Sequence, residues 1–212
     1  MWGIRFNNEK VWFEAHKEQY LNTLYEPMKA LNRQVYAAVM ERHKDLDLSA
    51  KVSRIYRDAR RLHGNGPYKD HLWMSMERLT DDWTDHPAFW FELEPEGYSW
   101  GMGYFMPTAL TMAKYRKRLD RDPKPFEKLV RAFNKQDIFK LDGEDYKKPK
   151  GESTALLEPW YNKRSLTLVG HGEPGETFTP AFADKLIEGY ESLMPFYKFF
   201  LSLEGDPDPR ES

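Results

Sequence analysis

The chain has 212 residues, no cysteine, and 32 lysines and arginines against 34 acidic residues, which gives a net charge of −2. These numbers exclude a protein held to nucleic acid by its overall charge, and they exclude disulfides, thiolate metal sites and cysteine nucleophiles. No apolar run approaches the roughly 18 residues of a membrane helix, and the N-terminus lacks the pattern of a signal peptide. We therefore expect a soluble, cytoplasmic protein that does not contact membranes.

The first third of the chain predicts helix, then strand, then a short helix. Apolar residues from 8 to 43 recur at helical spacing, and Pro27 within them predicts two helices or one kinked helix. Residues 51–58 supply β-forming side chains and predict a strand. A Gly-rich turn at 63–67 follows, and a short helix is plausible from about 69 to 79.

The middle of the chain gives the clearest local prediction, a β-hairpin. Residues 88–94 and 98–105 both alternate apolar and polar side chains, and three residues containing Gly97 join them. Gly97-Tyr98-Ser99-Trp100-Gly101 also matches the nucleophile elbow of hydrolases. The elbow needs a helix that starts at the serine, whereas Gly101-Met102-Gly103 favours a strand, so we reject a catalytic triad.

The second half predicts helices that flank short strands. Helices are expected after Pro107, after Asp122-Pro123 and over 182–201, a short strand or turn over 139–146, and a strand over 165–169. Because adjacent strands pair through a hairpin, the chain is predicted to be α+β, with a largely antiparallel or mixed sheet, a central hairpin and packed helices. We expect a single domain over 1–203 and a disordered polar tail over 204–212.

Basic residues gather in residues 51–69, where six bases face one acid. Arginine offers a planar fork to phosphate or carboxylate, and lysine a mobile point charge. The predicted ligand-binding residues are Arg54, Arg57, Asp58, Tyr68 and Lys69. Asp58 is assigned the role of orienting an arginine, and backbone amides around Gly64 and Gly66 would complete an anion nest. The alternative is that these charges form structural ion pairs.

A second basic segment, residues 114–135, has nine bases against three acids. It reads as the solvated face of a helix pair or, alternatively, as an interaction surface for nucleic acid or protein. The six histidines lack metal-ligand spacing, so no metal site is predicted. The sequence assigns neither a reaction nor a cofactor.

Several motifs together resemble one known family. They are Asn7-Asn8 with Trp12-Phe13, Arg54-Ile55-Tyr56-Arg57-Asp58, Pro67-Tyr68-Lys69, Gly101-Met102-Gly103, and Phe139-Lys140-Leu141-Asp142-Gly143. In this order they resemble the domain of unknown function 2461 family, over about residues 3–201. The resemblance implies one compact α+β domain without an assigned activity, and its motif positions here include Arg54, Arg57, Asp58, Tyr68 and Lys69. The chain departs from the family pattern at 61–66, so the chemistry of this loop can differ.

Overall fold

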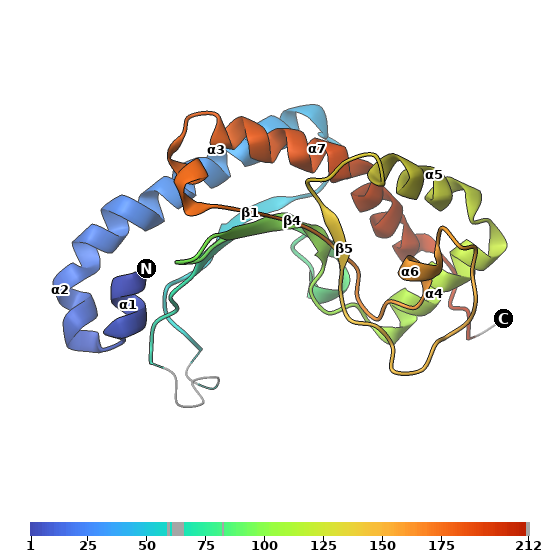
Figure 1. The fold of residues 1–212 in the computed structure, drawn as a ribbon, viewed down its shortest axis with the longest axis horizontal. Coiled ribbons are helices and arrows are strands. Elements are labelled where there is room, and N and C mark those ends of the chain that lie inside the picture. Colours follow the sequence, from blue (N-terminus) through green and yellow to red (C-terminus); the bar gives the residue numbers. More distant parts are fainter. Residues whose placement is uncertain (59, 61–65, 82, 211–212) are drawn as a thin grey trace. The chain divides into compact units, whose positions relative to one another are not determined.

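The computed structural model describes residues 1–58, 60, 66–81 and 83–210. Over these residues the strands form a six-stranded antiparallel sheet in the order β1-β2-β3-β4-β6-β5. The strands are β1 (Ser49–Val52), β2 (Leu72–Glu77), β3 (Pro87–Leu93), β4 (Tyr98–Tyr104), β5 (Lys140–Asp142) and β6 (Thr167–Gly172). The helices are α1 (Trp2–Phe6), α2 (Lys10–Tyr20), α3 (Glu26–Arg42), α4 (Ala109–Arg121), α5 (Lys124–Phe133), α6 (Glu158–Tyr161) and α7 (Phe182–Leu201) (Figure 1). The predicted α+β class is confirmed.

The chain forms two compact units. The first comprises Met1–Met76, Trp90–Trp100 and His171–Glu188, and the second comprises Glu77–Phe89, Gly101–Gly170 and Gly189–Ser212. Strands β3, β4 and β6 each have residues in both units. The expectation of a single domain over 1–203 stays a prediction.

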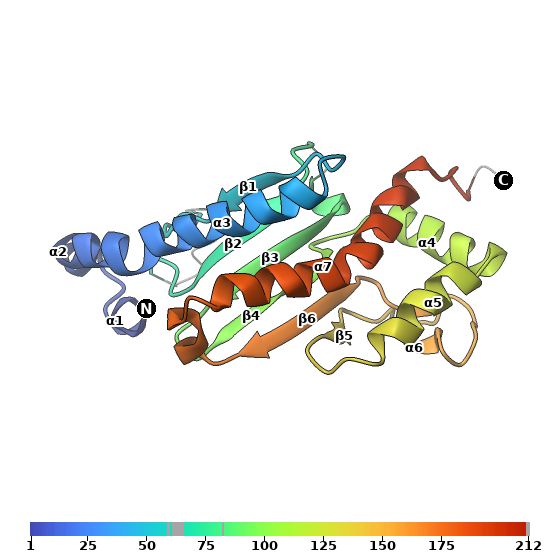
Figure 2. The same cartoon turned by 90° about the horizontal axis from the view of Figure 1, so that it is seen from above.

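The interruption predicted at Pro27 is present as a π-helical turn, Leu21–Tyr25, between α2 and α3. Proline has no backbone N–H, so the carbonyl four residues earlier, on Thr23, loses its ordinary helical partner. A wider turn accommodates this loss without ending the helix. Figure 2 shows α3 continuing along β1 and β2, and its residues Val35 and Val39 are fully buried.

The short helix predicted over 69–79 is wrong, because this segment contains strand β2. Leu72, Met74 and Met76 are buried, whereas the intervening Trp73 is only partly buried. Alternate side chains of a strand point to opposite faces of a sheet, so Trp73 lies on the face opposite Leu72 and Met74. The strand predicted over 51–58 is shorter and earlier, since β1 ends at Val52.

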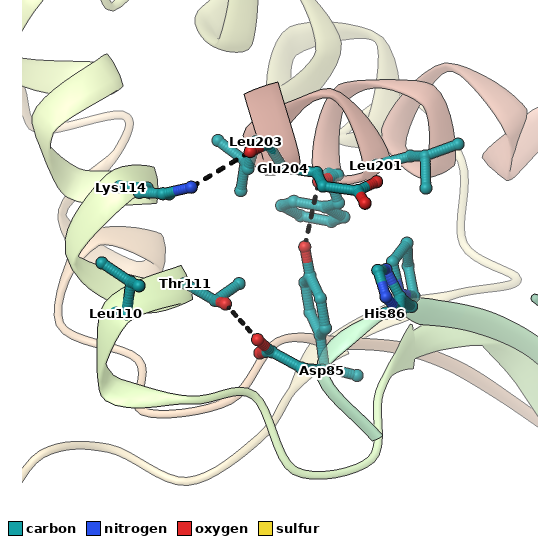
Figure 3. Close-up of a pocket in the computed structure, with 11 residues that line it drawn as sticks. Asp85, His86, Leu110, Thr111, Lys114, Leu201, Leu203 and Glu204 are labelled. Carbon is teal, nitrogen blue, oxygen red and sulfur yellow. Dashed lines mark hydrogen bonds between the residues drawn. The ribbon is translucent and has the colours of Figure 1, made fainter. Parts of the chain in front are cut away.

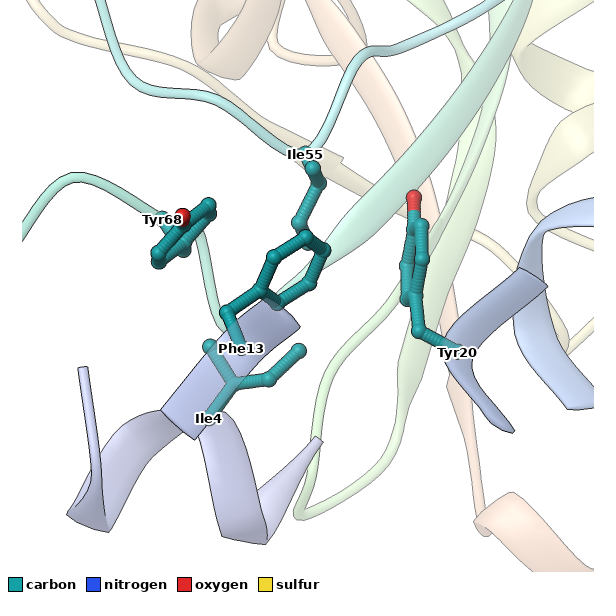
Figure 4. Close-up of a cluster of buried hydrophobic side chains, with 5 residues drawn as sticks. All are labelled: Ile4, Phe13, Tyr20, Ile55 and Tyr68. Carbon is teal, nitrogen blue, oxygen red and sulfur yellow. The ribbon is translucent and has the colours of Figure 1, made fainter. Parts of the chain in front are cut away.

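The first unit has a core of stacked and tilted rings between its N-terminal helices and the loops that follow β1. Ile4, Phe13, Tyr20, Ile55 and Tyr68 form this buried cluster (Figure 4). The ring centroids of Phe13 and Tyr68 lie 4.1 Å apart, close enough for stacking. The cluster therefore anchors α1 and α2 to the backbone on both sides of the 59–65 segment.

The hairpin and the later helices follow the sequence closely. Strands β3 and β4 pair through a turn in which the Glu94 N–H donates to the Gly97 carbonyl at 2.9 Å. Ser99 lies inside β4, as the rejection of the nucleophile elbow required. Thr108 caps α4 by accepting from the Thr111 N–H at 3.1 Å. The hairpin prediction is confirmed.

The second unit buries its own aromatic core between α5, α6 and α7. Phe126 contacts Trp160 and Phe196, and the rings of Trp160 and Phe196 stack at 5.5 Å. Within 204–210, expected to be a disordered tail, Asp206 accepts from Arg118 Nε at 2.7 Å.

Candidate functional site

An open groove of about 540 Å³ lies in the first unit, between the segment that follows β1 and the segment that enters β2. It is lined by Lys51, Val52, Ser53, Arg54, Tyr56, Arg57, Asp58, Lys69, His71 and Trp73. Three of the five predicted binding residues carry a positive charge, namely Arg54, Arg57 and Lys69. All three line this groove. Lys51 and the partly exposed ring of Trp73 join them.

Backbone pairing between the two segments holds this arrangement. Tyr56 and Tyr68 form an isolated antiparallel bridge. The Arg57 N–H donates to the Pro67 carbonyl at 2.8 Å, and the Lys69 N–H donates to the Ile55 carbonyl at 2.7 Å. This short ladder places Arg57 and Lys69 on the same face of the paired segments, on either side of the Tyr56–Tyr68 bridge.

Asn8, which precedes α2, forms hydrogen bonds with the segment that enters β2. Its Oδ1 accepts from the Tyr68 N–H at 2.9 Å, and its Nδ2 donates to the Tyr68 carbonyl at 2.8 Å. A Cβ at Gly66 would lie 2.3 Å from Asn8 Cγ, so only glycine fits beside this side chain. We refer to the pair of hydrogen bonds from Asn8 to Tyr68 as the Asn8 latch.

Arg57 is oriented by the backbone and by an aspartate that the sequence analysis missed. Its Nε donates to the Tyr68 carbonyl at 2.9 Å, and its Nη2 lies 3.5 Å from Asp70 Oδ1. Arg5 Nε also donates to Asp70, at 2.5 Å. Burial raises the pKa of Asp70, but the hydrogen bonds from Arg5, the backbone and His71, together with the charge of Arg5, outweigh burial, and the pKa lies below its ordinary value. Asp70 is therefore a charged anchor for both arginines.

Lys69 is half-buried among positive charges. Burial, and then the charge of Arg54, lower the pKa of Lys69 below its ordinary value. The ammonium groups of Lys69 and Lys51 each lie 5.6 Å from the centroid of the Trp73 ring, within range of a cation–π interaction. An anion bound here would relieve the repulsion that lowers the pKa of Lys69.

Arg54 is exposed at the groove, and among the described residues no carboxylate forms an ion pair with it. Asp58, predicted to orient an arginine, holds Arg60: its Oδ2 lies 2.8 Å from Arg60 Nη2, and its Oδ1 accepts from the Arg60 N–H at 3.0 Å. The structure thus leaves the guanidinium of Arg54 available to a ligand.

Tyr68 has a structural place rather than a place in the groove. Its side chain is 2% exposed and stacks on Phe13. The predicted amide nest stays a prediction, because Gly64 lies outside the described residues.

His71 lies at the groove beside two carboxylates. Its Nδ1 is 3.4 Å from Asp70 Oδ1, and its Nε2 is 3.7 Å from Glu92 Oε1. Burial raises the pKa of Glu92, and the charge of His71 opposes this rise. No role was predicted for His71 from the sequence. His71 lies two residues after Lys69 and two before Trp73. In a strand this spacing places all three side chains on one face, and it could have indicated His71 as a groove residue.

A smaller cavity of about 110 Å³ lies in the second unit, lined by residues of α4, of α7 and of the segment before β3 (Figure 3). Four of its polar residues, Asp85, Thr111, Lys114 and Glu204, already have partners. The Thr111 hydroxyl donates to Asp85 at 2.7 Å, and Lys114 Nζ donates to the Glu204 carbonyl at 3.1 Å. Ligand sites usually enclose about 300 to 1,000 Å³, so this cavity is too small and too fully bonded to compete with the groove.

The basic segment 114–135 has many of its charges engaged within the second unit. Arg118 pairs with Asp206, Arg131 lies 3.6 Å from Glu127, and Arg116 lies over the ring of Tyr146. These contacts fit the solvated face of a helix pair, and an interaction surface at 114–135 stays a prediction.

Over the described residues, no helix is long and apolar enough to cross a membrane, and no group of three or more His, Asp or Glu side chains is placed to hold a metal ion. The fold and the groove together define an α+β protein with an antiparallel sheet and one cationic, ring-lined hollow. The family comparison agrees with this description: residues 2–199 match the model of the conserved hypothetical protein family DUF2461, and the chain belongs to that family. The resemblance seen in the sequence is confirmed. No functionally curated protein matches the chain.

Proposed function

We propose that the protein binds a small phosphorylated or carboxylated molecule in the groove, through Arg54, Arg57 and Lys69, with Lys51 beside them. The observation that carries this proposal is that four cationic side chains line one open groove. The acidic residue that lines it, Asp58, is already paired with Arg60. The cytoplasmic location expected from the sequence is part of the same proposal.

The electrostatics support an anion rather than a cation as the ligand. Close positive charges repel one another, and the charge of Arg54 adds to burial in lowering the pKa of Lys69. An anion converts the repulsion into attraction and accepts charge-assisted hydrogen bonds from Arg54 and Arg57. Arg57 is held by the Tyr68 carbonyl and Asp70, so little side-chain freedom is lost when it binds.

Calorimetric titration with inorganic phosphate and with ribose 5-phosphate tests the proposal. One hydrogen bond to a charged group contributes about 1.5–3 kcal/mol, so Arg54→Gln should weaken binding about 10- to 100-fold. Arg33→Gln removes the same charge from an exposed position on α3 in the same unit and should leave affinity within about twofold. Absence of binding by both probes, or equal losses in the two variants, would refute the proposal.

A further inference from the structure

Two aromatic side chains line the groove together with the cations. Tyr56 is 45% exposed, and Trp73 presents its partly exposed ring from β2. Neither ring is needed to hold a phosphate or a carboxylate. Exposed rings gathered at one hollow indicate that a ligand with an apolar or flat part covers them.

The size of the groove gives a second, independent argument. Its volume of about 540 Å³ corresponds to on the order of 18 water molecules at about 30 Å³ each. That is several times the space of a phosphate ion, and it lies inside the range of sites for small organic ligands. The groove therefore leaves room for a ligand larger than a phosphate ion.

Resting on the proposed function, we propose that the ligand is a nucleoside monophosphate or a close chemical equivalent, with a flat heteroaromatic ring on Trp73 and its phosphate at Arg54 and Lys69. Lys51 and Lys69 each lie 5.6 Å from the Trp73 ring centroid, so a phosphate attached to a ring stacked on Trp73 has two ammonium groups beside it. Tyr56 supplies the second apolar wall.

The same combination of rings and cations also occurs in proteins that bind single-stranded nucleic acid. The structure favours the small ligand for two reasons. The groove has room for about one nucleotide, and the chain as a whole carries a net charge of −2, which repels a long polyanion.

The experiment compares the affinities of adenosine monophosphate, ribose 5-phosphate and inorganic phosphate by calorimetric titration. Stacking of a base on an aromatic side chain should make adenosine monophosphate at least about fivefold tighter than ribose 5-phosphate. Trp73→Leu should remove this preference, and Trp73→Phe should restore part of it. Phe178→Leu, which removes an exposed ring from the same unit outside the groove, is the matched control and should change neither affinity.

Each outcome separates this inference from the proposed function. If ribose 5-phosphate binds and adenosine monophosphate binds no more tightly, the ring assignment is wrong and the anion site stands. If none of the three probes binds, the proposed function itself is wrong. If Trp73→Leu does not fold, Tyr56→Leu replaces it and should reduce the preference for the base. A short DNA single strand that binds more tightly than adenosine monophosphate would overturn the small-ligand proposal in favour of nucleic acid.

Discussion

Asn8→Ala should loosen the groove from a position that no ligand touches. The substitution removes both hydrogen bonds of the Asn8 latch, at 2.9 Å to the Tyr68 N–H and 2.8 Å to its carbonyl. The carbonyl keeps a donor, because Arg57 Nε lies 2.9 Å away. The N–H, which belongs to a residue with a buried ring, loses its partner.

The expected loss follows from these contacts. A hydrogen bond contributes about 0.5–1.5 kcal/mol net, and a buried donor left without a partner costs about 1–3 kcal/mol. With the carbonyl still bonded to Arg57, we expect Asn8→Ala to cost about 2 kcal/mol. For a chain of this length, about 2 kcal/mol lowers the thermal midpoint by about 4–8 °C.

Hydrogen exchange at the Tyr68 amide is the assay that locates the effect, because this N–H loses its acceptor. Exchange there should accelerate at least about tenfold, since about 1.4 kcal/mol corresponds to a factor of ten. Asn7→Ala is the matched control, because the Asn7 side chain donates to the Gly3 carbonyl at an exposed position, and its loss should cost less than about 0.5 kcal/mol. Unchanged exchange at the Tyr68 amide, or equal midpoints for the two variants, would refute the role of the latch.

Two further predictions concern pH and packing. The affinity for sulfate should be highest while Lys69 is charged, and it should fall as the pH rises through the lowered pKa of Lys69, beginning below the ordinary value of 10.5. Binding titrations across alkaline pH should show this fall in the wild type. A matching fall in Lys69→Gln would contradict the assignment to Lys69. Gly103→Ala should lower the free energy of unfolding by about 1–3 kcal/mol or more, because the new Cβ would lie 2.3 Å from the Leu166 carbonyl oxygen. Urea unfolding measures this loss. The control is Gly175→Ala, whose Cβ would meet nothing within 4 Å. Equal unfolding midpoints in the two alanine variants would show that β4 and β6 yield more easily than this contact implies.

The sequence predicts those elements whose signals are local. The hairpin of β3 and β4 rests on alternation and a short Gly-containing turn, and both signals are contained within 17 residues or so of chain. The start of α4 after Pro107 rests on a threonine cap that hydrogen-bonds three residues away. Nothing distant competes with these preferences, so they survive in the folded chain.

Strand β2 shows how a local signal can be present and still be missed. In a helix His71 would lie on the opposite side from Lys69 and Trp73, but all three share one side of an extended segment. The buried set Leu72, Met74 and Met76 has the period of two that identifies a half-buried strand. Because this segment was predicted to be a helix, Trp73 was not predicted to line the groove. The proposed ligand class depends on this residue.

Asp70 could not be assigned its role from the sequence in the same way. Its strongest partner, Arg5, is 65 residues away, and no pattern near Asp70 indicates that α1 returns to this point. A single chain offers many acids that could pair with Arg57, and Asp58, only one residue from it, is the natural choice. Asp70 takes this place because the buried cluster packs α1 and α2 against Ile55 and Tyr68 and so brings Arg5 next to Asp70.

The placement of Tyr68 and Lys69 follows from the geometry of an extended chain. Neighbouring side chains in such a segment point to opposite sides, and here Lys69 lines the groove whereas the ring of Tyr68 is buried. The bridge between Tyr56 and Tyr68 makes the segment extended, and Phe13 takes the ring of Tyr68 into the core. Burying that ring is what turns Lys69 outward to the groove beside Trp73. The tyrosine in this motif therefore supports anion binding by fixing the direction of the lysine, and a Tyr68→Phe variant, which keeps the stacked ring, should retain the affinity for phosphate.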